Sequence, residues 1–143
     1  MTAVREATHD EIPELIDMLE GLHVASASAE LAPYCRDTMT ETLGNLIEHG
    51  FLMRTDHGVL GGLPFPLFFN RAALGIQELF WWVMPEYRKT GEGIALVQAF
   101  EDWGREIGAK FVIMMSQETM PAVNELYASR GYTRAEQNWT RTL

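Results

Sequence analysis

The sequence predicts a mixed α/β fold, of the α+β type, built around a single central sheet. The chain has 143 residues, of which 47% are apolar, and this size suits one compact domain with its own core. Segments in which apolar residues recur at helical spacing alternate with short apolar runs that are typical of buried strands. We expect residues 1–143 to form one domain, with a sheet of about six to seven strands flanked by about four helices.

The first half of the chain predicts two helices and a hairpin. A short strand is expected at residues 2–6, and a helix follows from Asp10, where acidic residues favour the positive end of the helix dipole. A second helix starts at Thr38 or Thr40 and ends near Gly50. The remaining elements are two strands at 51–54 and 59–60, the turn 55–58 between them, and a proline- and phenylalanine-rich connection at 64–70.

The second half centres on a strand at residues 76–83, which is apolar on both faces, as in a strand covered on both sides. Glu78 is the one ionisable residue in this strand. Trp81 and Trp82 point to opposite faces and are expected to join the core on each side. The later elements are a glycine-containing loop at 84–93, an amphipathic helix that stops at Gly108, a strand at 111–115, a short helix from Thr119 to Ser129, and two closing strands at 132–135 and 137–141.

The charge of the chain is strongly negative and unevenly placed. The formal net charge is −9, and residues 1–50 contain ten carboxylates but only two bases, Arg5 and Arg36. This sign opposes binding to nucleic acid or to an anionic membrane. Two interpretations of the acidic third stay open: a solvated face of amphipathic helices, or a field that gathers a cationic substrate. With a single cysteine and no apolar signal core at its start, the chain is expected to be cytoplasmic.

A glycine-rich turn joins the central strand to the next helix. It reads Arg88-Lys89-Thr90-Gly91-Glu92-Gly93 and starts with the only adjacent basic pair in the chain. Such a turn aims free backbone N–H groups outward at the positive end of the helix dipole, which suits an anion such as a pyrophosphate. A plain strand-to-helix turn is the alternative. Glu92 is unfavourable beside phosphates unless its side chain points to solvent.

Two segments resemble a known family. The turn at 88–93 is similar to the Arg/Gln-x-x-Gly-x-Gly/Ala motif with which the GNAT N-acetyltransferase superfamily holds the pyrophosphate of acyl-coenzyme A. Residues 78–87, of which 83–87 lie just ahead of Arg88, look like that family's fourth strand and its junction. Residues 126–132 resemble its Leu-Tyr-x-x-x-Gly-Phe/Tyr segment. The resemblance covers 76–135, which it identifies as the acyl-CoA-binding and catalytic core. It makes residues 1–50 an acidic helical segment on the substrate side.

The resemblance implies that an acetyl group passes from acetyl-CoA directly to an amine, with no covalent enzyme intermediate and no metal. The implied cofactor contacts are Arg88, Lys89, Thr90, Gly91, Glu92 and Gly93 at the pyrophosphate, and backbone N–H groups near Val83 and Met84 at the pantetheine and the thioester carbonyl. Many members carry an asparagine seven residues before the tyrosine. That position is Met120 here, and Asn124, on a similar face of the helix, is the candidate in its place.

Two residues are candidates for the proton transfers. A primary amine with a pKa near about 10.4 is almost wholly protonated at pH 7, so its acetylation needs a base. Glu78 is the candidate base because it is the one carboxylate in the apolar strand; the alternative is a structural carboxylate bound to neighbouring backbone. Tyr127, in the second motif, is the candidate acid for the departing thiolate, and core packing is its alternative role.

The acceptor is predicted to be a cationic amine: a polyamine, an aminoglycoside-like amine or a lysine-bearing protein. The segments that border the acceptor site in the family are acidic here, with Glu20, Glu30, Asp37 and Glu41 at or near expected loops. The alternatives are an acyl-CoA-binding regulatory module with weak catalysis and an unrelated small interaction domain. A homodimer through the closing strands or the phenylalanines at 65–69 stays open. The four histidines lack metal-ligand spacing, which argues against a zinc site.

Overall fold

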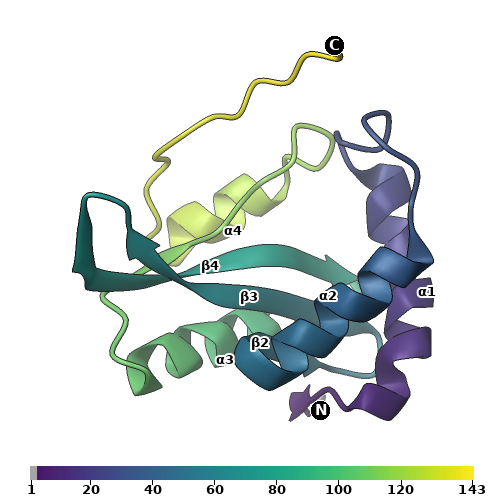
Figure 1. Ribbon diagram of the computed structural model, residues 1–143, viewed down its shortest axis with the longest axis horizontal. Coiled ribbons are helices and arrows are strands. Elements are labelled where there is room, and N and C mark those ends of the chain that lie inside the picture. Colours follow the sequence, from purple (N-terminus) through teal and green to yellow (C-terminus); the bar gives the residue numbers. More distant parts are fainter. Residues whose placement is uncertain (1–2) are drawn as a thin grey trace.

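Residues 3–143 are described by a computed structural model, and they form a five-stranded sheet with helices on both faces (Figure 1). The strand order follows the chain, from β1 to β5. The strands are β1 (Arg5–Glu6), β2 (Phe51–Arg54), β3 (Gly58–Leu67), β4 (Asn70–Val83) and β5 (Phe111–Ile113). The helices are α1 (Ile12–Ala25), α2 (Arg36–His49), α3 (Glu92–Glu106) and α4 (Val123–Ser129), with short 3₁₀ turns η1 (His9–Glu11) and η2 (Pro85–Tyr87). The predicted class, a mixed sheet with four helices, is confirmed. Of the expected first strand, residue 2 lies outside the described residues.

The two faces of the sheet carry separate cores. One core joins α1 and α2 to the sheet and includes the buried residues Leu15, Leu43 and Trp82. The other joins α3 to the opposite face around Phe100, and Trp81 packs against it. The two adjacent tryptophans therefore serve opposite faces, as the sequence predicts.

The sheet is antiparallel from β1 to β4 and parallel between β4 and β5. The parallel pairing is short, because it joins only Gly75–Gln77 of β4 to Phe111–Ile113. On its other edge, β4 pairs with β3 in a register that skips Leu79, so a bulge follows Glu78 directly. Within the described residues, the last part of β4, up to Val83, therefore has no ladder partner on the side of β5.

The connection expected at 64–70 is instead the tip of a long hairpin between β3 and β4. Pro64 and Pro66 escape strand prediction because proline lacks the N–H that a ladder uses. They are tolerated here because β2 stops short of them, and their missing donors fall on the edge that β2 leaves uncovered. The tip residues Phe68 and Phe69 are 94% and 71% exposed, so neither of them packs over the sheet edge.

The closing strands expected at 132–135 and 137–141 are not formed in the described part of the chain, so the sheet has five strands rather than six to seven. After α4 the chain continues as an exposed segment that leaves the body of the fold (Figure 1). Tyr132 is held at its start, because its hydroxyl donates to a carboxylate oxygen of Glu101 at 2.7 Å. Charged residues such as Arg134 interrupt the segment beyond it, which gives no continuous apolar face to bury.

A buried arginine fixes the start of α1 against the sheet. Arg54, at the end of β2, is 1% exposed and donates to Glu14 at 2.7 and 3.0 Å and to Glu11 at 3.0 Å. The hydrogen bond from Arg54 lowers the pKa of Glu14. Two carboxylates of the acidic third are thus committed to structure. No helix within residues 3–143 has the length and apolarity that a membrane span requires.

Candidate active site

Glu78 and Tyr127, the two predicted catalytic residues, meet at one backbone unit, that of Met115. The Met115 N–H donates to Oε1 of Glu78 at 2.8 Å, and the Tyr127 hydroxyl donates to the Met115 carbonyl oxygen at 2.7 Å. Glu78 comes from β4 and Tyr127 from α4, while Met115 follows the end of β5. The three elements therefore converge where β4 and β5 stop pairing.

Burial shifts the proton affinity of Glu78. Its side chain is 4% exposed, and burial raises the pKa of Glu78 to about 7, although the hydrogen bond from Met115 opposes the shift. A carboxyl group that titrates near neutral pH is suited to act as a general base. The bond to Met115 is the contact that a purely structural role would also require, so the raised pKa is the feature that favours catalysis.

Tyr127 stays protonated at neutral pH. Its side chain is buried, and burial together with the charge of Glu78 raises the pKa of Tyr127. Its ring centroid lies 6.0 Å from that of Trp81 and 5.5 Å from that of Tyr132. These aromatic contacts hold the ring in place, while the hydroxyl directs its proton at the Met115 carbonyl oxygen.

The two predicted backbone donors of β4 differ in what they face. The amide of Met84 donates to the His57 carbonyl at 2.9 Å, so the turn between β2 and β3 already occupies it. Successive N–H groups of a strand point to opposite edges, so the amide of Val83 points away from β3. The carbonyl of Val83 points the same way and accepts a bond from Nε of Arg88 at 3.0 Å. On the open edge Val83, and not Met84, presents its amide.

The glycine-rich turn has the geometry of an anion site. Gly91 caps α3 with a φ of 89°, a left-handed conformation that favours glycine. The first helical bond runs from the Ala95 amide to the Gly91 carbonyl at 3.0 Å, so the amides of Gly93 and Ile94 have no carbonyl partner within the helix. A Cβ at Gly91 would meet nothing within 4 Å. That open space and the free amides fit a pyrophosphate group.

Arg88 and Lys89 stand at the entrance to this turn, and both are exposed. The Arg88 guanidinium lies 4.5 Å from the ring centroid of Trp82, in addition to its bond to Val83. Its two terminal nitrogens make no hydrogen bond or ion pair with any described residue. The stem of Arg88 is therefore held in place while its outer donors stay available for an anion.

Glu92 does not point to solvent. Its side chain is 2% exposed, and Oε1 accepts a hydrogen bond from the His57 amide at 2.9 Å. Oε2 lies 2.9 Å from the Thr90 hydroxyl and 3.2 Å from Nδ1 of His57. Sequence reasoning missed His57, because a turn histidine with no nearby ligand spacing gives no local signal of a partner on a distant helix.

Asn124 lies in α4 about one turn before Tyr127, and it is partly exposed. Met120, at the position of the family's asparagine, packs against the core that α1 and α2 form. The departure from the family motif thus places an apolar anchor at that position, and leaves Asn124 as the amide side chain nearest to Tyr127 on the same helix.

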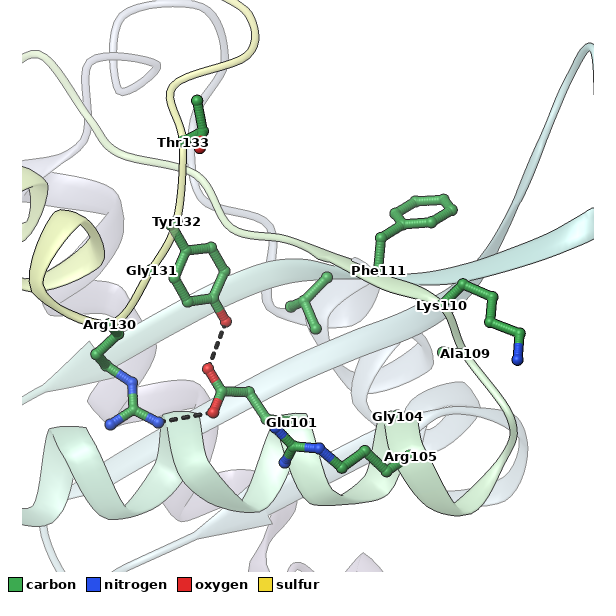
Figure 2. Close-up of a pocket in the computed structure, with 11 residues that line it drawn as sticks. Glu101, Gly104, Arg105, Ala109, Lys110, Phe111, Arg130, Gly131, Tyr132 and Thr133 are labelled. Carbon is green, nitrogen blue, oxygen red and sulfur yellow. Dashed lines mark hydrogen bonds and ion pairs between the residues drawn. The ribbon is translucent and has the colours of Figure 1, made fainter.

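A cavity of about 420 Å³ is lined by residues of α3, β5 and the segment after α4, and none of the predicted site residues lines it. Figure 2 shows the lining residues. The cavity's one carboxylate, Glu101, is already bound to Arg130 at 2.6 Å and to Tyr132 at 2.7 Å. Lys110 points away from this carboxylate (Figure 2). The cavity therefore offers no free carboxylate to act as a base, and the candidate site remains at Glu78 and Tyr127.

Solved structures of acetyltransferases share the fold. A GCN5-related N-acetyltransferase from Ralstonia eutropha matches with a TM-score of 0.78 and 18% identity, over 99% of this chain and 98% of that one. A predicted acetyltransferase from Clostridium acetobutylicum, solved with acetyl-CoA, matches with a TM-score of 0.72 and 12% identity, over 99% and 96%. An aminoglycoside antibiotic 6′-N-acetyltransferase from Acinetobacter baumannii matches with a TM-score of 0.73 and 15% identity, over 100% and 98%. No curated protein matches the chain.

The family model described as acetyltransferase (GNAT) family matches residues 16–132. This range contains Glu78, the glycine-rich turn and Tyr127, and it is most of the chain. Enzymes of this family take their acetyl group from acetyl-CoA, and the turn before α3 fits the pyrophosphate of that cosubstrate. The resemblance seen in the sequence is confirmed, and the chain belongs to the GNAT acetyltransferase family.

Proposed function

We propose that this acetyltransferase is an N-acetyltransferase that transfers the acetyl group of acetyl-CoA to the amine of a cationic acceptor. One observation carries the proposal. Glu78 is a buried carboxyl group with a pKa raised to about 7, and it lies where β4 and β5 separate, beside the protonated Tyr127. Proton removal from an amine is the chemistry that such a group serves.

Glu78 accepts a proton from the acceptor's ammonium group, directly or through one water molecule, and so frees the nitrogen lone pair. The nitrogen then bonds to the thioester carbonyl carbon while the carbon–sulfur bond breaks. Tyr127 turns its hydroxyl from Met115 to the departing sulfur and gives up its proton, and the second proton of the nitrogen replaces it. Glu78 releases its proton to solvent, so one amide, one thiol and one proton are produced.

The cosubstrate would be held by the backbone of the turn before α3 and by the two bases in front of it. The amides of Gly93 and Ile94 would bind the pyrophosphate, with Arg88 and Lys89 adding positive charge. Thr90 and Gly91 shape the turn. On the open edge of β4, the amide of Val83 would contact the pantetheine arm, and Asn124 would approach it from α4.

The proposal that the acceptor is cationic is supported by the positions of the acidic residues. The loop after α1 touches the segment after β5, because Thr119 donates to the Ala25 carbonyl at 2.7 Å and the Ala27 amide to Gln117 at 3.2 Å. Glu30 and Glu118, one on each of these two segments, are both exposed. Glu20, in contrast, is paired with Arg36 at 3.4 Å. We therefore assign the attraction of the acceptor to Glu30 and Glu118.

Calorimetric titration with CoA tests the cosubstrate site. Arg88→Ala should weaken binding about tenfold, because it removes a charge-assisted contact worth roughly 1.5 kcal/mol. Arg71→Ala is the matched control, since Arg71 is an exposed arginine at the other end of β4. Binding that is absent in the wild type, or equal in both variants, would contradict the proposed site.

An acceptor panel tests the proposed specificity. Spermidine, an aminoglycoside and a lysine peptide should be acetylated faster than an amine that carries no second positive charge. The double variant Glu30→Gln/Glu118→Gln should lower kcat/KM for spermidine several-fold, and less so at high salt, while CoA affinity stays the same. Equal rates with neutral and cationic amines would remove the charge argument and leave the acetyltransferase activity standing.

A further inference from the structure

Glu92 is an unusual residue to find in an anion-binding turn. A carboxylate at the first position of α3 competes with phosphates for the positive end of the helix dipole. The structure removes this conflict, because the side chain is buried beneath the turn and its oxygens are directed at His57 and Thr90. What the carboxylate does there is a separate question from phosphate binding.

The contacts of Glu92 and His57 join the turn between β2 and β3 to the anion-binding turn and to η2. One oxygen accepts from the His57 amide at 2.9 Å, which ties α3 to the turn between β2 and β3. The other lies 2.9 Å from the hydroxyl of Thr90, within the anion-binding turn itself. The imidazole of His57 in turn stacks on Tyr87 of η2, with ring centroids 3.4 Å apart and an angle of 3° between the rings. The anion-binding turn is thus held at both of its ends, by Glu92 at the start of α3 and by the contact of His57 with Tyr87 in η2.

We infer that Glu92, with His57, is a positioning residue that holds the anion-binding turn in the shape that receives CoA. The inference rests on the proposed cosubstrate site, but the role itself is carried by the contacts of the side chain. Neither the carboxylate nor the imidazole needs to touch the ligand. Burial alone would raise the pKa of the carboxyl, but the hydrogen bonds from His57 and Thr90 help to lower it to about 2, so the carboxylate stays charged at neutral pH.

The opposite role would be electrostatic. If Glu92 acted only through its charge, replacing it with glutamine would strengthen CoA binding, since a negative charge near the phosphates would disappear. If it acts by position, the same replacement weakens binding, because glutamine keeps an acceptor oxygen for the His57 amide but places an NH₂ group where the second carboxylate oxygen meets the Thr90 hydroxyl. The sign of one substitution therefore separates the two roles.

The first test is amide hydrogen exchange without any ligand. Glu92→Gln should raise exchange of residues 85–93 roughly tenfold and leave β1 to β3 unchanged. Glu86→Gln is the matched control, because it removes an exposed carboxylate from the same stretch of chain. Unchanged exchange in Glu92→Gln would overturn the inference. If wild-type protein bound no CoA, the proposed function would fail, whereas this exchange experiment would still decide the role of Glu92.

The second test is CoA affinity by calorimetry. Glu92→Gln should raise Kd about tenfold, while Glu86→Gln leaves it within about twofold. His57→Ala should weaken binding in the same direction and should add little when combined with Glu92→Gln, because the two residues act as one unit. Binding as tight as wild type, or tighter, in Glu92→Gln would overturn the inference. If Glu92→Gln does not fold, His57→Ala alone decides it by the same exchange and affinity measurements.

Discussion

Two carboxyl groups in the second half of the chain, Glu78 and Glu92, have pKa values shifted in opposite directions, although the side chains of both are almost fully covered. Glu78 is 4% exposed and Glu92 is 2% exposed, yet the pKa of Glu78 rises to about 7 and that of Glu92 falls to about 2. The difference lies in the donors. Glu78 receives one bond, from a backbone amide, whereas several donors surround Glu92. Burial disfavours the charged form of a carboxyl group, and hydrogen-bond donors can stabilise that form enough to outweigh the effect of burial.

The largest test of this comparison is Glu78→Gln. Loss of a positioned base should lower kcat by about 10² to 10⁴, because glutamine cannot accept the proton. The ascending limb of the kcat–pH profile, with an apparent pKa near 7, should disappear with it. The glutamine oxygen can still accept the bond from Met115, so CoA affinity should hold. A variant that keeps both the rate and the limb would assign Glu78 a structural role only.

The second test uses stability and not rate. The folded-state pKa of Glu78 lies above its ordinary value of 4.5, so the folded protein binds the proton more tightly than the unfolded chain does. Its contribution is therefore fully present below pH 4.5 and is lost as the pH rises towards about 7, an effect of up to about 3 kcal/mol. Urea unfolding of wild type and Glu78→Gln at pH 5 and pH 8 measures this. The free energy of unfolding of the variant, relative to that of the wild type, should be higher at pH 8 than at pH 5.

Glu92 should behave in the opposite direction when urea unfolding of wild type and Glu92→Gln is compared at pH 3 and pH 5. Because its pKa is lowered, its contribution is present above pH 4.5 and is lost as the pH falls towards about 2. Parallel pH dependence for Glu78→Gln and Glu92→Gln would contradict the contrast between the two carboxylates.

Tyr127→Phe tests the partner of Glu78. It removes the proposed acid and leaves the ring packing, so kcat should fall about tenfold to a hundredfold with little change in the KM for acetyl-CoA. Steady-state kinetics with the best acceptor of the panel gives both numbers. Tyr132→Phe is the matched control, because the Tyr132 hydroxyl donates to Glu101 outside the candidate site. Unchanged turnover in Tyr127→Phe would remove its role as acid.

Thr90→Val sharpens the comparison by removing a single donor from Glu92. The variant loses the contact of the Thr90 hydroxyl with the Glu92 carboxylate together with its contact with the Tyr87 carbonyl. It should therefore lower the free energy of unfolding by about 1 to 2 kcal/mol and shift the pKa of Glu92 upwards. Thermal unfolding at pH 7, with Thr38→Val as an exposed control, measures the first effect. A stability equal to that of the control would show that the donors of Glu92 are redundant.

The fold was predictable where one element carries its own pattern. The helices and the strand ending at Val83 follow from apolar spacing, and the two faces of that strand follow from strand alternation. The long hairpin between β3 and β4 was not predictable, because Pro64 and Pro66 are compatible with a strand only where no neighbouring strand needs an N–H group from them. The absence of the closing strands has the same origin, since strand formation depends on a partner that local sequence does not describe.

The candidate site divides in the same way. Glu78 and Tyr127 could be picked from a single strand and a single motif, and the glycine turn from its composition. The pairing of Glu92 with His57 could not, because it depends on how α3 approaches a turn far away in the sequence. The choice between Val83 and Met84 depends on strand register, which no residue type reveals.

Met115 links Glu78 and Tyr127 through its backbone, so changes of its side chain leave this link in place. Its N–H and its carbonyl connect the candidate base and the candidate acid, while its own side chain is 37% exposed. Most replacements at this position would keep both backbone groups, so homologous chains are free to differ there without losing the link. Proline is the exception, because it alone lacks the donor. A centre made of main chain is invisible to an alanine scan and is maintained by the fold itself.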